Sequence, residues 1–498
     1  MTGLGAVAAW TSPMLVVAVV ARAAAGGIET PLFVLAVLAA PMLALLAKPR
    51  PRGARSGFVT TLSLVTVVCV LGAGFRVVAD LGHVLGLEVG ATLGSVVALV
   101  LVTTVWRDHH RVAATALVLG AAALLVALLI VGLAAAVTPW TAWSRVASRS
   151  AFALGERSEW TRDGARLPPS TTLTFVEPHR ITAATDALVR VTEHDRVTSV
   201  RERRLAAGDS LQLRPGDTLE IPAGARLRFE PGRRVPGAPA SGVTWADGAG
   251  APRARLLSGW AGLTLTLIGG ALMIVRPAAP LSRASAVWGP GVVFLVTLAA
   301  TCWGVYAVDA APELALEVPA SSLLVRLAPV VADEPWRARI LTAIVLALLA
   351  VFLGCAAGLR RCLVDLVAAG SPDLAESTRR RAVEAATWVA MVLAAAATSL
   401  VVRDPFALLL QGSGLAAAIL LGPLLTMGDG VGVERARAKG ALAGGLIFVV
   451  VAALARWPAA AGPLDALARY PALVAAPGAW LVANVSKSAQ KVAAARRG

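Results

Sequence analysis

The sequence predicts an all-α polytopic membrane protein of about 12 transmembrane helices, with a small β-domain inserted between two membrane halves. Its composition is the first reason: 57% of the 498 residues are hydrophobic, only 15% are charged, and the mean hydropathy is +0.73. A soluble domain is far less apolar. The second reason is that long apolar runs flank a single long polar segment, residues 139 to 256, whose pattern is that of β-strands.

Charge and cysteine content narrow the possible partners. In a soluble protein the formal net charge of +16 would suggest nucleic acid. Here many basic residues lie in loops and tails beside apolar runs, so membrane topology and anionic lipid headgroups explain the charge, and no nucleic-acid partner is expected. The cysteines lie in or beside apolar runs without a CxxC pair, so we predict no disulfide framework and no metal site. They are Cys69, Cys302, Cys355 and Cys362.

The apolar runs give the candidate spans. A helix needs ~20 apolar residues to cross the hydrocarbon core. The first run has no basic segment before it, so we interpret it as a retained span and not as a signal peptide. The spans are residues 5 to 24, 30 to 47, 57 to 79, 83 to 105, 113 to 137, 257 to 276, 285 to 308, 338 to 359, 384 to 402, 405 to 426, 439 to 456 and 470 to 485.

Basic residues in the short connections predict the orientation, because Lys and Arg resist translocation. If every span is real, all the strongly basic connections fall on one side. We therefore expect a bacterial inner-membrane protein with both termini in the cytoplasm and residues 139 to 256 outside it. These connections are residues 48 to 55, 107 to 111, 276 to 283, 360 to 381, 434 to 439 and the C-terminal tail.

The polar insert predicts a small antiparallel β-domain. Residues 210 to 233 form three eight-residue units, each with apolar residues two apart followed by a Pro or Gly turn. A metal-binding cupin would need more histidines than His179 and His194. The predicted core residues are Leu211, Leu213, Leu219, Ile221, Leu227 and Phe229. Five arginines could attract an anionic substrate or an acidic partner, or form a solvated face: Arg201, Arg203, Arg204, Arg233 and Arg234.

The two membrane halves have matching interruptions. Five spans before the insert and five after it would have opposite topology, the layout of inverted-repeat transporters, in which the first helix of each half is broken. The first span contains Trp10, Thr11, Ser12 and Pro13, and the sixth contains the pair Gly269 and Gly270. Pro removes a backbone donor, and paired glycines weaken a helix. The alternative is that Gly and Pro are ordinary residues in membrane helices. The predicted domains are residues 1 to 138, 139 to 256, 257 to 437 and 438 to 498.

Several segments resemble the sodium/solute symporter family, in particular its acetate-permease-like branch. They are GLGAVAAWTSP near the start, VVCVLGAGFRVVADLGHVLGLEVG, RDPFALLLQGSGLAAAILLGPLLTM and the terminal YPALVAAPGAWLVANVSK. The resemblance covers most of the chain outside the insert. It implies symport of a small monocarboxylate by alternating access, coupled to Na⁺ or H⁺, with Trp10, Thr11 and Ser12 contacting the substrate or the ion.

The chain also departs from that family. It has no counterpart of the helix that usually precedes the first core helix. At the positions where sodium-coupled members carry two hydroxyl residues it has Leu349 and Ala350, neither of which offers a side-chain oxygen to a hard cation. A competing hypothesis is therefore a transport-inactive, transporter-derived subunit that anchors or docks protein partners through residues 139 to 256.

Ionisable residues inside a span are costly and are candidates for function. Arg76 and Asp80 lie four apart in the third span, with His83 and Glu88 close behind. They could form a proton relay or gate, but a snorkelling structural pair at the membrane edge is the favoured interpretation. The sequence contains no P-loop, dinucleotide fingerprint or hydrolase triad, so we expect neither an enzyme nor an organic cofactor.

Overall fold

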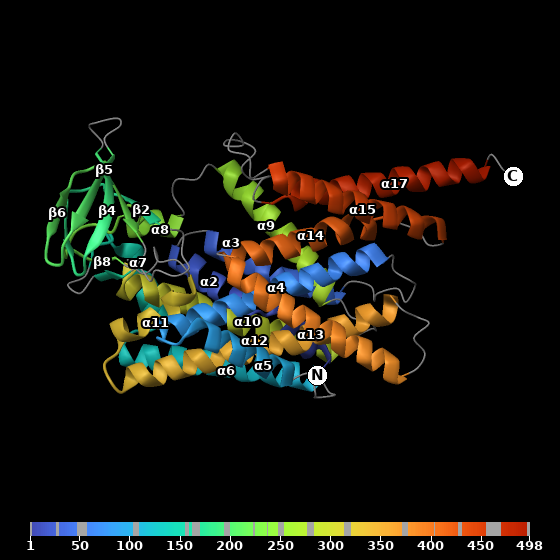
Figure 1. Ribbon diagram of the computed structural model, residues 1–498, viewed down its shortest axis with the longest axis horizontal. Helices are drawn as coiled ribbons and strands as arrows, with labels where there is room; N and C mark the ends of the chain where they lie inside the picture. The colour runs from blue at the N-terminus through green and yellow to red at the C-terminus, as the bar shows by residue number, and fades with distance from the viewer. Residues whose placement is uncertain are drawn as a thin grey trace.

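Apolar helices form one long bundle, and two small sheets form a β-domain at one end of it (Figure 1). The structure is a computed structural model. It describes residues 2–25, 29–46, 57–102, 109–154, 159–161, 170–193, 200–222, 225–236, 238–247, 253–275, 283–312, 320–370, 377–402, 404–426, 431–454 and 470–495. Two connections used to predict orientation, 48 to 55 and 276 to 282, lie outside these residues, as does His194.

The first membrane half contains a helix at each of the five predicted spans, and the first of these is divided in two. Val, Leu and Ala dominate the sequences on all sides of these helices, as expected for helices surrounded by protein and lipid. The helices are α1 (Thr2–Trp10), α2 (Pro13–Ala25), α3 (Glu29–Leu46), α4 (Gly57–Val84), α5 (Val89–Val102) and α6 (His109–Ala134).

In the described residues after the insert, a helix lies at each of the seven later spans, and α11 is additional to them. The additional helix was missed because its 12 residues are too short for a span. Its buried residues recur at helical spacing and include Leu323, Leu324 and Leu327. The helices are α9 (Arg253–Ile274), α10 (Arg283–Ala310), α11 (Ala320–Val331), α12 (Trp336–Gly370), α13 (Ser377–Val401), α14 (Pro405–Leu424), α15 (Val431–Leu454) and α17 (Ala472–Ala495).

The length and composition of these helices make the chain a multi-pass membrane protein. Within the described residues, 7 helices are long and apolar enough to cross a membrane, and the bent pair α1 and α2 would bring the number to 8. Three shorter apolar helices lie in α3, α5 and α9. The twelve spans stay a prediction.

The described residues of the insert form two four-stranded antiparallel sheets, with strand orders β1-β8-β3-β6 and β2-β7-β4-β5. The six predicted core residues are all buried, none more than 5% exposed. The strands are β1 (Glu159–Thr161), β2 (Ser170–Thr174), β3 (His179–Ala183), β4 (Ala187–Thr192), β5 (Val200–Leu205), β6 (Ser210–Leu213), β7 (Thr218–Pro222) and β8 (Arg226–Phe229).

The three eight-residue units become β6, β7 and β8, but they do not pair with one another. Both β6 and β8 flank β3 in one sheet, whereas β7 lies between β2 and β4 in the other. The strands β6, β7 and β8 therefore alternate between the two sheets, and their buried faces meet across the interior.

Two short helices seat the β-domain on the bundle: α7 (Pro139–Ser148) and α8 (Gly242–Asp247). The rings of Trp143 in α7 and Trp245 in α8 lie 4.8 Å apart. Trp245 is only 2% exposed, and its indole N–H donates to the carbonyl of Ala24 at 3.4 Å. This bond satisfies a carbonyl in the last turn of α2, which has no partner within its own helix.

Arg149, the residue after α7, makes further contacts between the β-domain and the bundle. Its guanidinium donates to the carbonyls of Val308 (3.1 Å) and Asp309 (2.6 Å), and it forms an ion pair with the Asp309 carboxylate at 2.8 Å. One turn earlier on α10, the Tyr306 hydroxyl donates to the Val137 carbonyl at 2.7 Å. The β-domain is thus fixed to the ends of α2 and α10 by directed polar bonds.

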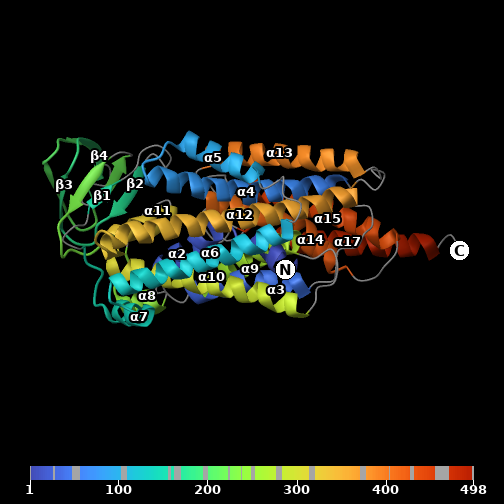
Figure 2. The same ribbon diagram turned by 90° about the horizontal axis from the view of Figure 1, so that it is seen from below.

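The β-domain and the C-terminal end of α17 lie at opposite ends of the bundle (Figures 1 and 2). We expect Ser210→Cys in β6 and Val492→Cys in α17 to react with a membrane-impermeant maleimide from opposite sides of the membrane. Both positions are exposed, whereas the native cysteines are buried or half-buried. Labelling is compared in intact and permeabilised cells. Reaction of both variants from the same side would contradict this arrangement.

Candidate functional site

The first span is interrupted close to its middle. The helix α1 ends at Trp10, α2 begins at Pro13, and the segments on either side of the break are bent by 62°. Proline explains the position, because it lacks an N–H and disfavours helical geometry in the residue before it. The interruption coincides with the break predicted from Trp10 to Pro13.

Thr11 and Ser12 satisfy the backbone at this break. The Thr11 backbone N–H and its hydroxyl both donate to the Val7 carbonyl, at 3.0 and 3.1 Å. The Ser12 hydroxyl accepts from the Leu15 N–H at 3.2 Å and so caps α2. Both residues are at most 1% exposed. Their hydroxyls are engaged by the same segment, which gives these two predicted binding residues a structural role.

Trp10 is buried where α1 meets α9. It is 1% exposed and lies against Gly270 of α9, where an added Cβ would be 2.9 Å from the Trp10 ring and 2.5 Å from the Ser413 hydroxyl of α14. Within the described part of the chain, the Trp10 indole nitrogen and the hydroxyls of Ser413 and Thr266 are buried without a hydrogen-bond partner. Thr266 is one turn before Gly270. Among the described residues, the three helices that meet near Gly270 thus each carry a buried polar group without a hydrogen-bond partner: α1 the Trp10 indole, α9 the Thr266 hydroxyl and α14 the Ser413 hydroxyl.

The predicted break at Gly269 and Gly270 is wrong, since α9 is uninterrupted from Arg253 to Ile274. Its glycines serve close packing instead. A Cβ on Gly269 would collide with the backbone of Ala417 in α14, and one on Gly270 would collide with Ser413. Small residues let membrane helices approach closely, and these two glycines bring α9 against α14.

The expected cation positions, Leu349 and Ala350, lie on α12 and are half-buried. The residue of α12 that reaches the break is Cys355, more than a turn further along, whose thiol donates to the Ala9 carbonyl at 3.3 Å. A neutral thiol is a poor ligand for a hard cation such as Na⁺. The described residues contain no group of three His, Cys, Asp or Glu side chains that could hold a metal ion.

Arg76 and Asp80 form a buried ion pair on α4. The Arg76 Nε and Asp80 Oδ1 atoms lie 2.9 Å apart, and the side chains are 3% and 5% exposed. Arg76 also donates to the Ser399 carbonyl of α13 at 3.3 Å. The snorkelling interpretation is wrong, because the pair is enclosed by protein and joins two helices. Of the other predicted relay residues, His83 is half-buried near the end of α4 and Glu88 is exposed beyond it.

Sequence reasoning missed the residues that other helices contribute to these sites. Thr266, Ser399 and Ser413 are polar residues, and Cys355 is a thiol residue, inside otherwise apolar runs. Such residues are a usable signal, because a polar side chain in a span usually faces protein. The pattern along one helix does not show which neighbour it meets.

No family model and no curated protein sequence matches the chain. The resemblance to the sodium/solute symporter family therefore rests on the residues and their order.

The close packing of α9 leads to a prediction. Gly270→Ala should lower the stability of the purified protein by about 1–3 kcal/mol, because the added methyl group meets Trp10 and Ser413. Gly291→Ala is the matched control, since a Cβ there meets nothing within 4 Å. Thermal unfolding in detergent measures both. Equal effects of the two substitutions would contradict the packing role of Gly270.

The buried ion pair on α4 leads to a second prediction about stability. Arg76→Met should destabilise the protein by about 3–5 kcal/mol, since it removes the ion-pair partner of buried Asp80. The double variant Arg76→Met/Asp80→Leu should recover part of that loss. Arg380→Met is the control, because the Arg380–Glu384 pair has the same 2.9 Å separation while Arg380 is 40% exposed; it should cost at most ~1 kcal/mol. A similar midpoint shift for Arg76→Met and Arg380→Met would refute this ranking.

Proposed function

We propose that this chain is a transporter-derived membrane scaffold that holds its β-domain at the membrane surface and docks protein partners there. The observation that carries the proposal is the uninterrupted α9, packed closely against Trp10 and α14 where a transporter of this type needs its second break.

The pattern of helix contacts supports a transporter-type ancestry. An inverted repeat pairs α1/α2, α3, α4, α5 and α6 with α9, α10, α12, α13 and α14, in that order. If two helices are in contact, the helices paired with them in the other half should then also be in contact. Four contacts made by helices of the first half have their counterparts after this exchange. The contact of α1 with α6 corresponds to that of α9 with α14, and the contact of α2 with α10 corresponds to that of α9 with α3. The contact of α6 with α12 corresponds to that of α14 with α4, and the contact of α4 with α5 corresponds to that of α12 with α13. This favours the five-plus-five repeat predicted from the sequence.

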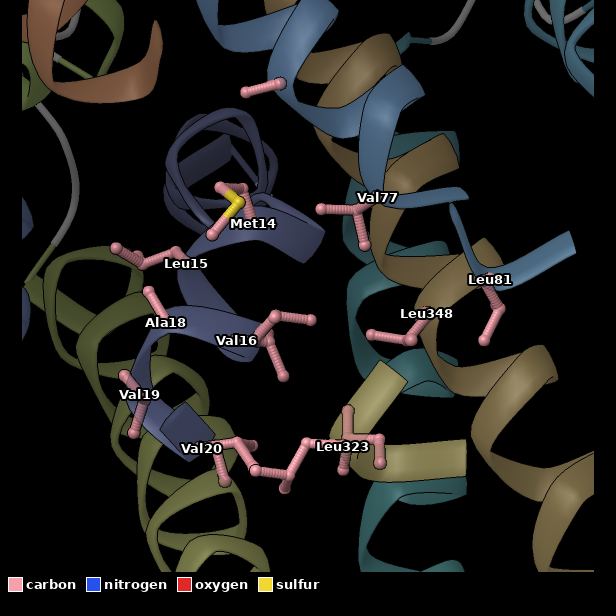
Figure 3. Close-up of a cluster of buried hydrophobic side chains, with 14 of the residues drawn as sticks. Met14, Leu15, Val16, Ala18, Val19, Val20, Val77, Leu81, Leu323 and Leu348 are labelled. Carbon is pink, nitrogen blue, oxygen red and sulfur yellow. The ribbon is translucent and has the colours of Figure 1, made fainter. Parts of the chain in front are cut away.

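The surroundings of α2 support a role without transport. Figure 3 shows apolar side chains of α2 facing Val77 and Leu81 of α4, Leu323 of α11 and Leu348 of α12. All four of these residues are at most 3% exposed. Alternating access would need a polar route past the break, and this side of it is filled by hydrocarbon.

A second candidate is symport of a small monocarboxylate by alternating access. The unpartnered groups of Trp10, Thr266 and Ser413 favour it, because an indole N–H and two hydroxyls can donate to a carboxylate. With Cys355 at the Ala9 carbonyl, the coupling ion would be H⁺ in preference to Na⁺.

For the orientation, we keep the proposal drawn from the basic connections. Both termini would lie in the cytoplasm and the β-domain outside the inner membrane of a bacterium. Ser210→Cys would then be the position that reacts in intact cells.

Uptake separates the two candidates. The scaffold proposal predicts no uptake of labelled acetate or pyruvate into proteoliposomes under either a sodium or a proton gradient. It also predicts that stoichiometric protein partners co-purify with the chain. Saturable uptake that Ser413→Ala abolishes, while the protein stays folded, would overturn the scaffold and support symport through the junction of α1, α9 and α14.

A further inference from the structure

Resting on the proposed docking role, we propose that the free edge of β5 binds an extended, acidic segment of a partner protein as an added strand. The partner would be recognised by main-chain hydrogen bonds along the edge and by carboxylates that meet two arginines.

The strand β5 (Val200–Leu205) lies at one margin of its sheet. It pairs with β4 along its whole length, from Thr192 opposite Val200 to Ala187 opposite Leu205. No other described strand pairs with its far side. Every second residue of an antiparallel edge strand points its N–H and C=O outward, so this side can accept another strand. Figure 1 shows β5 on the margin of the β-domain away from α7, where a soluble partner has access.

Exposure distinguishes this strand from the others. Residues 200 to 204 are all exposed, and only Leu205 is buried. Val200 is 53% exposed, and Leu188, opposite Arg204 on β4, is 55% exposed. The margin thus combines apolar and basic side chains.

The arginines of this margin are not equivalent. Arg190 is occupied by Glu202 (2.7 Å) and Glu220 (3.3 Å). Arg201 lies 3.4 Å from Glu193. Among the described residues no acidic side chain lies within ion-pair distance of Arg203 or Arg204.

The predicted cluster of five arginines is divided in the fold. Arg233 pairs with Glu230 at 3.3 Å, and Arg234 donates to the Ala238 carbonyl at 3.3 Å. Both follow β8, in the other sheet. The two cations free to meet a partner are therefore neighbours on β5.

The faces on which the β5 side chains lie, given by the register of β5 on β4, define the residue pattern expected in the partner strand. Arg203 lies opposite buried Val189 and Arg204 opposite exposed Leu188, so the two arginines are on opposite faces of the sheet. Val200 shares the face of Arg204. Directly opposed side chains in a ladder lie about 4.5–5.5 Å apart at Cβ. An antiparallel partner would thus carry two adjacent acidic residues followed, after two residues, by an apolar one.

Charged edges also protect sheets from aggregation. Protection requires only charge, whereas strand addition requires a matching charge on the partner and free partner N–H groups. The experiment is built on these differences.

The probe is a fluorescein-labelled peptide, Thr-Glu-Glu-Thr-Thr-Val-Thr, titrated against the full chain in nanodiscs and followed by fluorescence anisotropy. Control peptides carry Lys-Lys in place of Glu-Glu, or N-methyl groups on alternate residues. We expect Arg203→Glu/Arg204→Glu to weaken binding of the acidic peptide by about tenfold or more. Arg226→Glu/Arg228→Glu, at two exposed positions on β8, is the matched control because it changes the net charge equally, and it should leave binding unchanged. The Lys-Lys and N-methylated peptides should not bind.

Equal binding of the Glu-Glu and Lys-Lys peptides would overturn the proposal, as would equal weakening by the β8 control or an absence of binding. The experiments distinguish failure of the scaffold proposal from failure of the strand-binding proposal. Solute uptake together with selective peptide binding would refute the scaffold and keep the strand site. Stoichiometric partners without peptide binding would keep the scaffold and remove this site.

Discussion

The interior of a membrane offers no water to an open backbone, and the break between α1 and α2 places helix ends in that interior. The structure around it can be understood as a response to this constraint. Thr11 and Ser12 use their side chains on the local backbone, and Cys355 reaches across from α12 to the Ala9 carbonyl. Around the break, α1 packs against α6, α10 and α12 at once.

Close approach in turn depends on small residues. A Cβ on Gly358 of α12 would lie 2.6 Å from the Ala9 nitrogen, so only glycine lets α12 come near enough for the neighbouring cysteine to bond. Gly270 has the same function on α9, against Trp10. The cost of this arrangement is rigidity, since close-packed helices have little room to slide past one another. The glycines at these contacts therefore leave α1 little freedom to move relative to α9 and α12.

Local chemistry was predictable from the sequence, and relations between helices were not. Proline at position 13 marks the break because its ring acts on its own helix. Alternation of apolar residues in the insert likewise marks buried strand positions, because side chains point to alternate faces within a single strand. Gly269 and Gly270 are ambiguous, because a glycine pair either interrupts a helix or admits a neighbour, and only the position of Ala417 decides between them. The ion pair on α4 was recognised, but its burial depends on α13, and the crossing of β6, β7 and β8 between sheets depends on the whole insert.

The seat of the β-domain has a consequence for the order in which the protein assembles during synthesis. Arg149 lies 160 residues before Asp309, and Trp245 lies 221 residues after Ala24. When the insert leaves the ribosome, the end of α2 is already made but α10 is not. The sheets can form early, yet they cannot settle on the bundle until α10 has been inserted, and such distant contacts form late. The polar bonds between the β-domain and α10 are therefore among the last that the chain can make.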